Sequence, residues 1–131
     1  MTVLYMDASA FLKVYVEEPQ SRSLRRFLRR RPRPWVSSAI LRVEATRSLR
    51  RSSEELIDEI HDALRRTRLV PVDDAVLSLT AVVEPAALRT LDAIHLATAL
   101  VLGSDLDAVV TYDRRMATAA ESLGLRTVAP S

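Results

Sequence analysis

The sequence predicts an α/β fold with a central parallel sheet. Short apolar runs rich in β-branched residues alternate with helical runs along the 131 residues, and this alternation is typical of parallel strands joined by crossover helices. The chain is 48% hydrophobic and 27% charged, which is the composition of a globular protein rather than of a disordered one. A chain of this length buries enough surface to fold around one core, so we expect a single domain over residues 1–131.

The predicted elements of the first half follow from apolar patterning and from residues that start or end helices. Pro19 ends the first helix, because proline removes a helical hydrogen bond and clashes with the preceding turn. Residues 52–55, Ser-Ser-Glu-Glu, have the spacing of a capping box and should open a helix with one apolar stripe. We expect a strand at 2–6, a helix at 8–17, an arginine-rich helix that ends before Pro32, a strand at 35–37, helices at 39–51 and from 52 onward, and a strand at 69–72.

The second half repeats the alternation. Thr90 is a predicted N-cap, and the two glycines of the chain, Gly103 and Gly124, each suit the position just past a helix. Because both glycines have this use, we expect no glycine-rich loop that cradles a nucleotide phosphate. We expect a helix at 74–83, a helix from 90 to the Gly103 turn, a strand at 108–112, a helix between Asp113 and Gly124, and a last strand at 126–129.

Composition excludes several classes of protein. The chain has no cysteine, so it has no disulfide, no thiol nucleophile and no cysteine-based zinc or iron–sulfur site. Its longest apolar stretch, residues 91–102, is interrupted by Asp92 and His95 and is shorter than the ~20 residues of a membrane span. The first residues lack the basic start of a secretory signal, and we therefore expect a cytoplasmic protein.

Positive charge is concentrated in one segment. The chain has 19 basic and 17 acidic residues and a net charge of +2, yet seven arginines occur between residues 22 and 33. Arginine binds phosphate through two parallel hydrogen bonds. The segment is either a track for a polyanion or a solvated helix face, and composition alone does not choose between them.

Two aspartates follow predicted strands. Asp7 comes directly after the first strand, and Asp113 comes directly after the fourth. The carboxyl ends of parallel strands line the ligand crevice of an α/β sheet, so both side chains are candidates for a functional site. The alternative for each is an N-cap on the helix that follows.

Two further carboxylates lie on helix faces that are otherwise apolar. Glu44 follows Ile40 and Leu41 by four and three residues and shares their face. Asp92 lies in a helix that is apolar almost all round. A carboxylate that points at a core is costly unless it is paired or binds a cation. The alternatives are an ion pair with a nearby arginine for Glu44 and compensation of the helix dipole for Asp92.

The four carboxylates together predict a divalent cation. Two carboxylates ~4 Å apart repel by about 4 kcal/mol at an effective dielectric of about 20, so four of them converge only around positive charge. Oxygen ligands without cysteine or a histidine pair favour Mg²⁺ or Mn²⁺ over zinc. The chemistry that such an ion best supports is phosphoryl transfer or phosphodiester hydrolysis, with one ion or a pair of ions.

Four segments of the chain carry a family resemblance. They are Tyr5-Met-Asp7-Ala-Ser-Ala-Phe-Leu-Lys13, Val36-Ser-Ser-Ala-Ile-Leu-Arg-Val-Glu44, Leu91-Asp-Ala-Ile-His-Leu-Ala-Thr98 and Val110-Thr-Tyr-Asp-Arg-Arg-Met116. In this order they resemble the PIN-domain nucleases, specifically the VapC-type ribonuclease toxins of bacterial toxin–antitoxin pairs, and residues 120–125 resemble the closing helix of that family. The resemblance implies a three-layer α/β/α sandwich whose parallel sheet brings the ends of the first and fourth strands together.

The resemblance also implies a metal-dependent endoribonuclease that is neutralised by a cognate antitoxin and commonly forms a homodimer. Its catalytic and metal-binding acids correspond to the quartet Asp7, Glu44, Asp92 and Asp113, with Glu44 holding a water bound to Mg²⁺ or Mn²⁺. Ser9 and Thr111 match supporting hydroxyl positions, whose alternative is local bonding to the backbone. The family sometimes has a further acid just after Asp113, where this chain has arginines, so the number of ions stays open.

Several alternatives stay open beside this interpretation. Three arginines that flank the acids, Arg42, Arg89 and Arg114, are candidates for binding RNA phosphates. His95 either orients a carboxylate or RNA, or packs between helices, which is the role we favour. A phosphatase or receiver-like domain would need a second acid at the place of Ser9 and a lysine near the site, and the only lysine, Lys13, lies in the first helix. The remaining alternative is a non-catalytic RNA- or protein-binding module with a structural ion.

Overall fold

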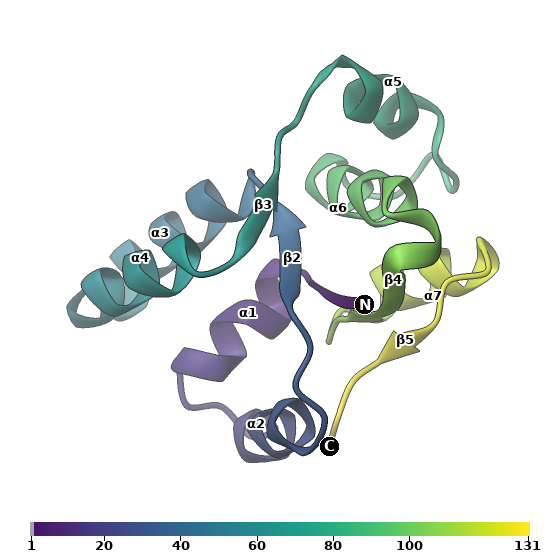
Figure 1. Cartoon of the computed structure of the whole chain (residues 1–131). Coiled ribbons are helices and arrows are strands. Elements are labelled where there is room, and N and C mark those ends of the chain that lie inside the picture. Colours follow the sequence, from purple (N-terminus) through teal and green to yellow (C-terminus); the bar gives the residue numbers. More distant parts are fainter. Residues whose placement is uncertain (1) are drawn as a thin grey trace.

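The strands that the structure describes form one sheet, and every pairing in it is parallel. The computed structural model describes residues 2–131, in which five strands alternate with seven α-helices (Figure 1). The strands are β1 (Val3–Met6), β2 (Trp35–Ser38), β3 (Arg68–Val70), β4 (Leu106–Val110) and β5 (Thr127–Val128). The helices are α1 (Ala8–Tyr15), α2 (Ser21–Arg30), α3 (Leu41–Ser52), α4 (Ile57–Arg65), α5 (Asp74–Val82), α6 (Thr90–Val101) and α7 (Arg114–Ser122).

The strand order β3-β2-β1-β4-β5 places β1 at the centre of the sheet. The chain builds outward from β1 to β2 and β3, and then returns across β1 to form β4 and β5. The last residues of the two central strands, Met6 and Val110, lie in register. A topological switch point of this kind, between β1 and β4, is where α/β sheets bind their ligands.

Side chains of the central strands alternate between two cores. Leu4 and Met6 of β1 pack with the helices α1 to α4 on one face, together with Ala108 and Val110 of β4. Tyr5 points the other way and packs against α6 and α7. Helix α5 packs against α6, outside this second layer (Figure 1). The predicted three-layer α/β/α sandwich is therefore confirmed.

Several predicted boundaries differ from the structure. Residues 52–55 do not form a capping box, because α3 continues to Ser52 and a short 3₁₀ turn at Glu54–Leu56 separates it from α4. Thr90 is the first residue of α6 rather than its cap, and Arg89 at the cap position makes no side-chain cap bond. Strand β4 ends at Val110, so Asp113 follows it by three residues instead of directly.

The predicted glycine turns are confirmed. Gly103 and Gly124 have φ angles of +55° and +82°, which side chains with a Cβ rarely adopt. At the end of α7 the amides of Gly124 and Leu125 donate to the carbonyls of Glu121 and Ala120, the paired bonds that close a helix through glycine. Among residues 2–131 no helix is long and apolar enough to cross a membrane.

Candidate active site

Asp7 is buried at the carboxyl end of β1. It caps α1, since its Oδ1 accepts a hydrogen bond from the Ala10 amide at 3.0 Å and another from Ser9 Oγ at 2.6 Å. Its Oδ2 accepts a hydrogen bond from Thr111 Oγ1. The side chain is only 5% exposed, and this burial raises the pKa of the Asp7 carboxyl, while the hydrogen bonds oppose the shift. Asp7 therefore caps α1, as the alternative proposed, and its carboxylate lies at the carboxyl end of β1.

Ser9 and Thr111 join the segments that follow β1 and β4. Ser9 Oγ accepts a hydrogen bond from the Tyr112 amide at 3.0 Å, and Thr111 Oγ1 accepts one from the Asp113 amide at 3.1 Å. Each hydroxyl therefore donates to Asp7 and accepts from the β4–α7 segment. This arrangement fixes Asp113 relative to Asp7, although the two residues are 106 positions apart in the sequence.

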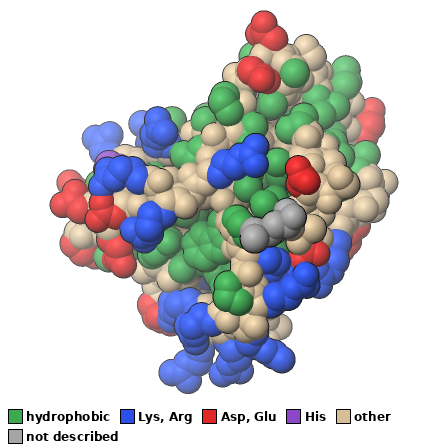
Figure 2. Space-filling model, in the orientation of Figure 1, with side chains coloured by type: hydrophobic (Ala, Val, Ile, Leu, Met, Phe, Trp, Pro, Cys, Tyr) green, Lys and Arg blue, Asp and Glu red, His purple; other side chains and the backbone are tan. Residues whose placement is uncertain are grey.

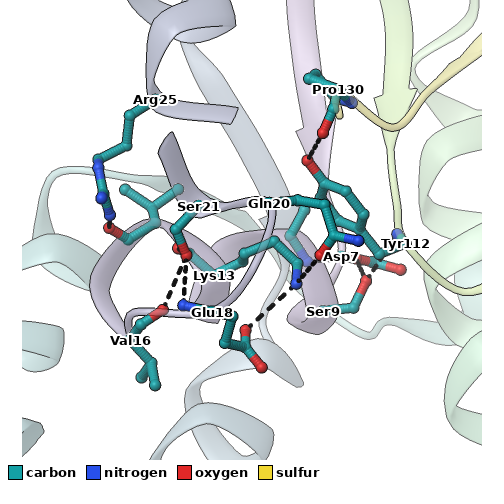
Figure 3. A network of polar contacts seen from close by, with 12 residues as sticks. Asp7, Ser9, Lys13, Val16, Glu18, Gln20, Ser21, Arg25, Tyr112 and Pro130 are labelled. Carbon is teal, nitrogen blue, oxygen red and sulfur yellow. Dashed lines mark hydrogen bonds and ion pairs between the residues drawn. The ribbon is translucent and has the colours of Figure 1, made fainter. Parts of the chain in front are cut away.

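Lys13 lies one turn after Ser9 on α1 and approaches the same segment near Tyr112 (Figure 3). Its side chain is largely buried, donates to Gln20 Oε1 at 3.0 Å and pairs with Glu18 at 3.5 Å. The ammonium lies 4.7 Å from the ring centroid of Tyr112, a distance at which a cation is attracted to an aromatic face. The Tyr112 hydroxyl donates to the Pro130 carbonyl at 2.7 Å. Lys13 is therefore occupied by Glu18, Gln20 and Tyr112, which disfavours the receiver-like alternative.

Asp113 is the N-cap of α7. Its Oδ1 accepts hydrogen bonds from the amides of Arg115 at 2.9 Å and Met116 at 3.2 Å. Both of these bonds use the same carboxylate oxygen. Asp113 thus combines a structural role with a position at the switch point of the sheet.

Glu44 is held by a buried histidine. It lies in the first turn of α3, and its Oε1 is 2.6 Å from Nε2 of His95 on α6. The other ring nitrogen of His95, Nδ1, is 2.6 Å from the Tyr5 hydroxyl of β1. His95 is 1% exposed, and Tyr5 is fully buried. Within residues 2–131 Glu44 forms no ion pair with an arginine. The His95 ring is packed in the interior, which is the role we favoured, and it also contacts the Glu44 carboxylate, which is the alternative.

Asp92 connects the four carboxylates electrostatically. It lies half-buried in the first turn of α6. Burial raises the pKa of Asp92, and the charges of Asp113, Asp7 and Glu44 raise it further. Hydrogen bonds through Ser9 and Thr111 join Asp7 to the segment of Asp113, and Glu44 contacts His95 on the same helix as Asp92. The four carboxylates therefore lie on the side of the sheet where the strands have their carboxyl ends, a region that we call the acidic edge.

The chemistry of the quartet fits a hard divalent cation. All of its donor atoms are carboxylate oxygens, which Mg²⁺ and Mn²⁺ prefer, and their mutual repulsion is what positive charge would relieve. Within residues 2–131 no three acidic or histidine side chains form a ready-made ion site. Hydrogen bonds from the protein hold the carboxylates of Asp7, Glu44 and Asp113 in place.

The three candidate arginines occupy different places. Arg114, exposed at the start of α7, lines a cavity of about 240 Å³ together with Thr111 and Asp113. Arg89 is exposed at the N-cap position of α6, three residues before Asp92. Arg42 lines a separate hollow beside α4. The structure thus brings Arg114 to the acidic edge and places Arg42 at another hollow.

Known proteins resemble this chain in sequence and in fold. Residues 4–122 match the family model described as PIN domain. The chain belongs to the PIN-domain family. This PIN domain is 48% identical to Ribonuclease VapC46 of Mycobacterium tuberculosis over 131 residues that cover 100% of both chains. It is 40% identical to Ribonuclease VapC35 of the same organism, over 98% of this chain and 97% of the relative. The resemblance to VapC-type proteins is therefore confirmed.

Solved structures show the same fold at low sequence identity. Mycobacterium tuberculosis VapC20, described as a sarcin-ricin loop cleaving toxin, superposes on this PIN domain with a TM-score of 0.76 and 15% identity, over 97% of this chain and 99% of that one. A toxin–antitoxin complex from Klebsiella pneumoniae gives a TM-score of 0.75 and 17% identity, over 98% of each chain. At these identities the likeness concerns the fold alone.

Tyr5 and Lys13 are the site residues that sequence reasoning missed. Tyr5 reads as a core residue of a buried strand, and Lys13 as a surface residue of the first helix. One signal was available for Tyr5, because strand alternation sets it opposite Leu4 and Met6, toward the helix that carries His95. No local signal shows that Lys13 would be buried, since its partners Glu18, Gln20 and Tyr112 come from two other segments.

Proposed function

We propose that this PIN domain is a metal-dependent endoribonuclease toxin that hydrolyses RNA phosphodiester bonds and is neutralised by a cognate antitoxin. The observation that carries the proposal is the pair of hydroxyls, Ser9 and Thr111, that bond Asp7 and hold the segment of Asp113 beside it at the switch point of the sheet. The charges of Asp7, Glu44 and Asp113 also raise the pKa of Asp92, which supports the proximity of the four carboxylates. Full-length relatives that are 48% and 40% identical bear the name ribonuclease, which supports RNA as the substrate.

Asp7, Asp92 and Asp113 are the residues that would hold Mg²⁺ or Mn²⁺. When bound, the ion would supply positive charge at the scissile phosphate and lower the pKa of a coordinated water. Ser9 and Thr111 keep both oxygens of Asp7 in place, because each donates to a different one. The chain needs no covalent intermediate, since it offers no thiol, and neither of its histidines bonds a serine.

Glu44 is the proposed base of the reaction. His95 fixes the carboxylate through Nε2, and Tyr5 fixes the ring of His95. A carboxylate oriented in this way can align the attacking water and accept its proton. The half-buried position of Glu44, whose side chain is 16% exposed, leaves it open to water.

Arg114 is the arginine that the geometry supports best as a ligand of RNA phosphate, because it shares a cavity with Thr111 and Asp113. Arg89 is a second candidate through its place beside the first turn of α6. Arg42 has weaker support, since it lines the hollow with His61 and Arg65 rather than the acidic edge.

The proposed partners follow from the family. An antitoxin would cover or distort the acidic edge, and a homodimer is the expected assembly. We place the activity in the cytoplasm, where RNA and antitoxin would meet. Co-purification with the product of a neighbouring short reading frame tests the antitoxin, and light scattering of the purified protein tests the dimer.

The decisive experiment combines metal removal with one isosteric substitution. We expect EDTA to stop RNA cleavage by the purified protein and Mg²⁺ or Mn²⁺ to restore it. Asp7→Asn should abolish cleavage and keep the fold, because asparagine retains the capping oxygen. The matched control is Asp73→Asn, which changes the same kind of N-cap on α5 and should cleave normally.

Two results would contradict the proposal. Cleavage that continues in EDTA would exclude a metal-dependent site, and full activity of Asp7→Asn would remove this residue from it. A metal that raises the melting temperature while no RNA is cleaved would instead support a binding module with a structural ion.

A further inference from the structure

One helix carries an uncommon pattern of charge. The ten residues of α2 include five arginines and no acidic residue. Helix α4, by contrast, mixes acids with a basic residue, and its Arg65 pairs with Asp62 one turn earlier. Like charges four residues apart on a helix repel each other, and α2 has no acid in its first turn to balance the helix dipole. The charge of α2 therefore weakens the helix that bears it.

Four of the α2 arginines form one exposed stripe. They lie within one side of the helix, and we call them the α2 arginine face: Arg22, Arg26, Arg29 and Arg30. Within residues 2–131 none of the four forms an ion pair. The nearby Arg25 pairs with Glu17, and Arg33 pairs with Asp107. In Figure 2 Lys and Arg side chains gather along the lower edge of the molecule, where Figure 1 places α2.

The opposite side of α2 is already used by the core. Leu24 and Leu28 are buried, and Phe27 packs against the same cluster. No apolar side of α2 is therefore free to enter a membrane. Protein interfaces are enriched in aromatic and apolar residues at their centres, and the exposed side of α2 offers only arginine. A polyanion backbone is the partner that such a surface fits best.

The α2 arginine face begins next to the acidic edge. Gln20, the residue that precedes α2, lines the same cavity of about 240 Å³ as Thr111, Asp113 and Arg114. It also accepts the hydrogen bond of Lys13, which braces Tyr112. The helix axis then leads about 15 Å away from this cavity, at 1.5 Å for each residue.

We propose that the α2 arginine face binds the phosphate backbone of RNA that flanks the bond to be cleaved. The inference rests on the proposed ribonuclease function for the identity of the polyanion. In this arrangement the acidic edge acts on one phosphate, and the face holds further phosphates of the same strand. These contacts are electrostatic and independent of base sequence.

The test measures RNA binding in EDTA, where no cleavage is expected. The α2 variant is Arg22→Gln/Arg26→Gln/Arg30→Gln, since glutamine has nearly the helix propensity of arginine. The matched control is Arg47→Gln/Arg50→Gln/Arg51→Gln, which removes the same charge from exposed arginines of α3. Fluorescence anisotropy with a labelled single-stranded RNA gives log K against log salt for each protein, and circular dichroism verifies that each is folded.

We expect the slope of log K against log salt to be less steep in the α2 variant than in the wild type. The difference should be about 0.7 for each lost phosphate contact, or about 2 for three contacts. Between about 50 and about 200 mM salt, the wild-type affinity should then fall roughly 20-fold more than that of the variant. The α3 control should keep the wild-type slope. Replacing the same three α2 residues by lysine should also keep it, because lysine retains the charge.

Two outcomes would overturn the inference. An equal reduction of the salt slope in the α2 variant and in the α3 control would show a general effect of net charge. An unchanged slope in the α2 variant would show that the α2 arginine face does not bind RNA, and would leave an acidic protein surface as its partner. The proposed function is judged separately, by whether the wild type cleaves the same RNA once Mg²⁺ is added. A wild-type protein that binds RNA through α2 and never cleaves it would contradict only the proposed ribonuclease function.

Discussion

His95 shows how a single buried side chain can orient a carboxylate, here that of Glu44, the proposed base. A carboxylate can only accept a hydrogen bond, so Nε2 of His95 carries the hydrogen toward Glu44. Burial raises the pKa of Tyr5 above its ordinary value, so its hydroxyl stays protonated and can donate to Nδ1. This chain of bonds joins β1, α6 and α3 and fixes one tautomer of the ring.

At the residue scale we expect His95→Ala to lower RNA cleavage about 10- to 100-fold and to raise the Mg²⁺ concentration for half-maximal activity, as losses of residues that support ligands do. His95→Gln should retain part of the activity, because its amide can still donate to Glu44. The control is His61→Ala, which removes the other histidine, bonded to Thr46 at 3.1 Å. Equal cleavage rates for His95→Ala and His61→Ala would rule out the orienting role.

At the scale of single elements, the start of α7 combines an observed helix cap with a proposed metal ligand, both at Asp113. The two amides at the start of this helix bond Oδ1 of Asp113, and an N-cap of this kind stabilises a protein by about 1 kcal/mol. A change at this position can therefore disturb the fold, the reaction or both. The two roles separate experimentally, because serine caps a helix as well as aspartate does but brings no charge.

We expect Asp113→Ser to melt close to the wild-type temperature and to lose RNA cleavage. Asp113→Ala should lose cleavage and also about 1 kcal/mol of unfolding free energy. Denaturant titration and the cleavage assay on the same preparations measure both effects. Wild-type cleavage by the folded serine variant would restrict Asp113 to its capping role.

The same elements show what could be predicted from the sequence. Periodicity predicted the order of the strands and helices, and it placed Glu44 on an apolar face toward the sheet, because both depend on local spacing. Local spacing failed at residues 52–55, where the amide of Ser53 bonds Leu49 and ends α3 instead of opening α4. It also extended the fourth strand through Thr111 and Tyr112, although β4 ends at Val110 and Thr111 bonds Asp7.

Contacts between segments far apart in the sequence could not be predicted from local patterns. The bond between His95 and Tyr5 joins residues 90 positions apart, and the one between Thr111 and Asp7 spans 104. The sheet order creates both contacts, since it places β1 beside β4 and under α6. The catalytic roles of the quartet and the extent of one domain over residues 1–131 stay predictions.

At the scale of the whole molecule, the acidic edge lowers stability at neutral pH when no metal is added. Burial and neighbouring carboxylates raise the pKa of Asp92, so this group has a higher pKa in the folded chain than in the unfolded one. Such a group destabilises the fold above its folded pKa, where it is ionised. The penalty shrinks as the pH falls below that pKa and disappears once the pH is below the pKa of the unfolded chain.

We expect Asp92→Asn in EDTA to melt a few degrees above the wild type at neutral pH. The difference should shrink as the pH falls through the raised pKa of Asp92, because the wild-type carboxyl then becomes neutral as well. The control is Asp74→Asn, which changes an exposed acid in the first turn of α5 and should give no gain. Identical melting curves for the wild type and Asp92→Asn would contradict the mutual repulsion of the quartet.

The single return of the chain across β1 also divides the molecule into two complementary pieces. The link at residues 71–73 separates a fragment with Asp7 and Glu44 from one with Asp92 and Asp113. A break in the backbone there would leave two of the four quartet carboxylates on each fragment, so neither fragment alone could form the whole site. Expressed as separate polypeptides, the two halves should not cleave RNA. Cleavage should return only when β4 pairs with β1, so fusing each half to one of two binding partners would make RNA cleavage report that the partners have met.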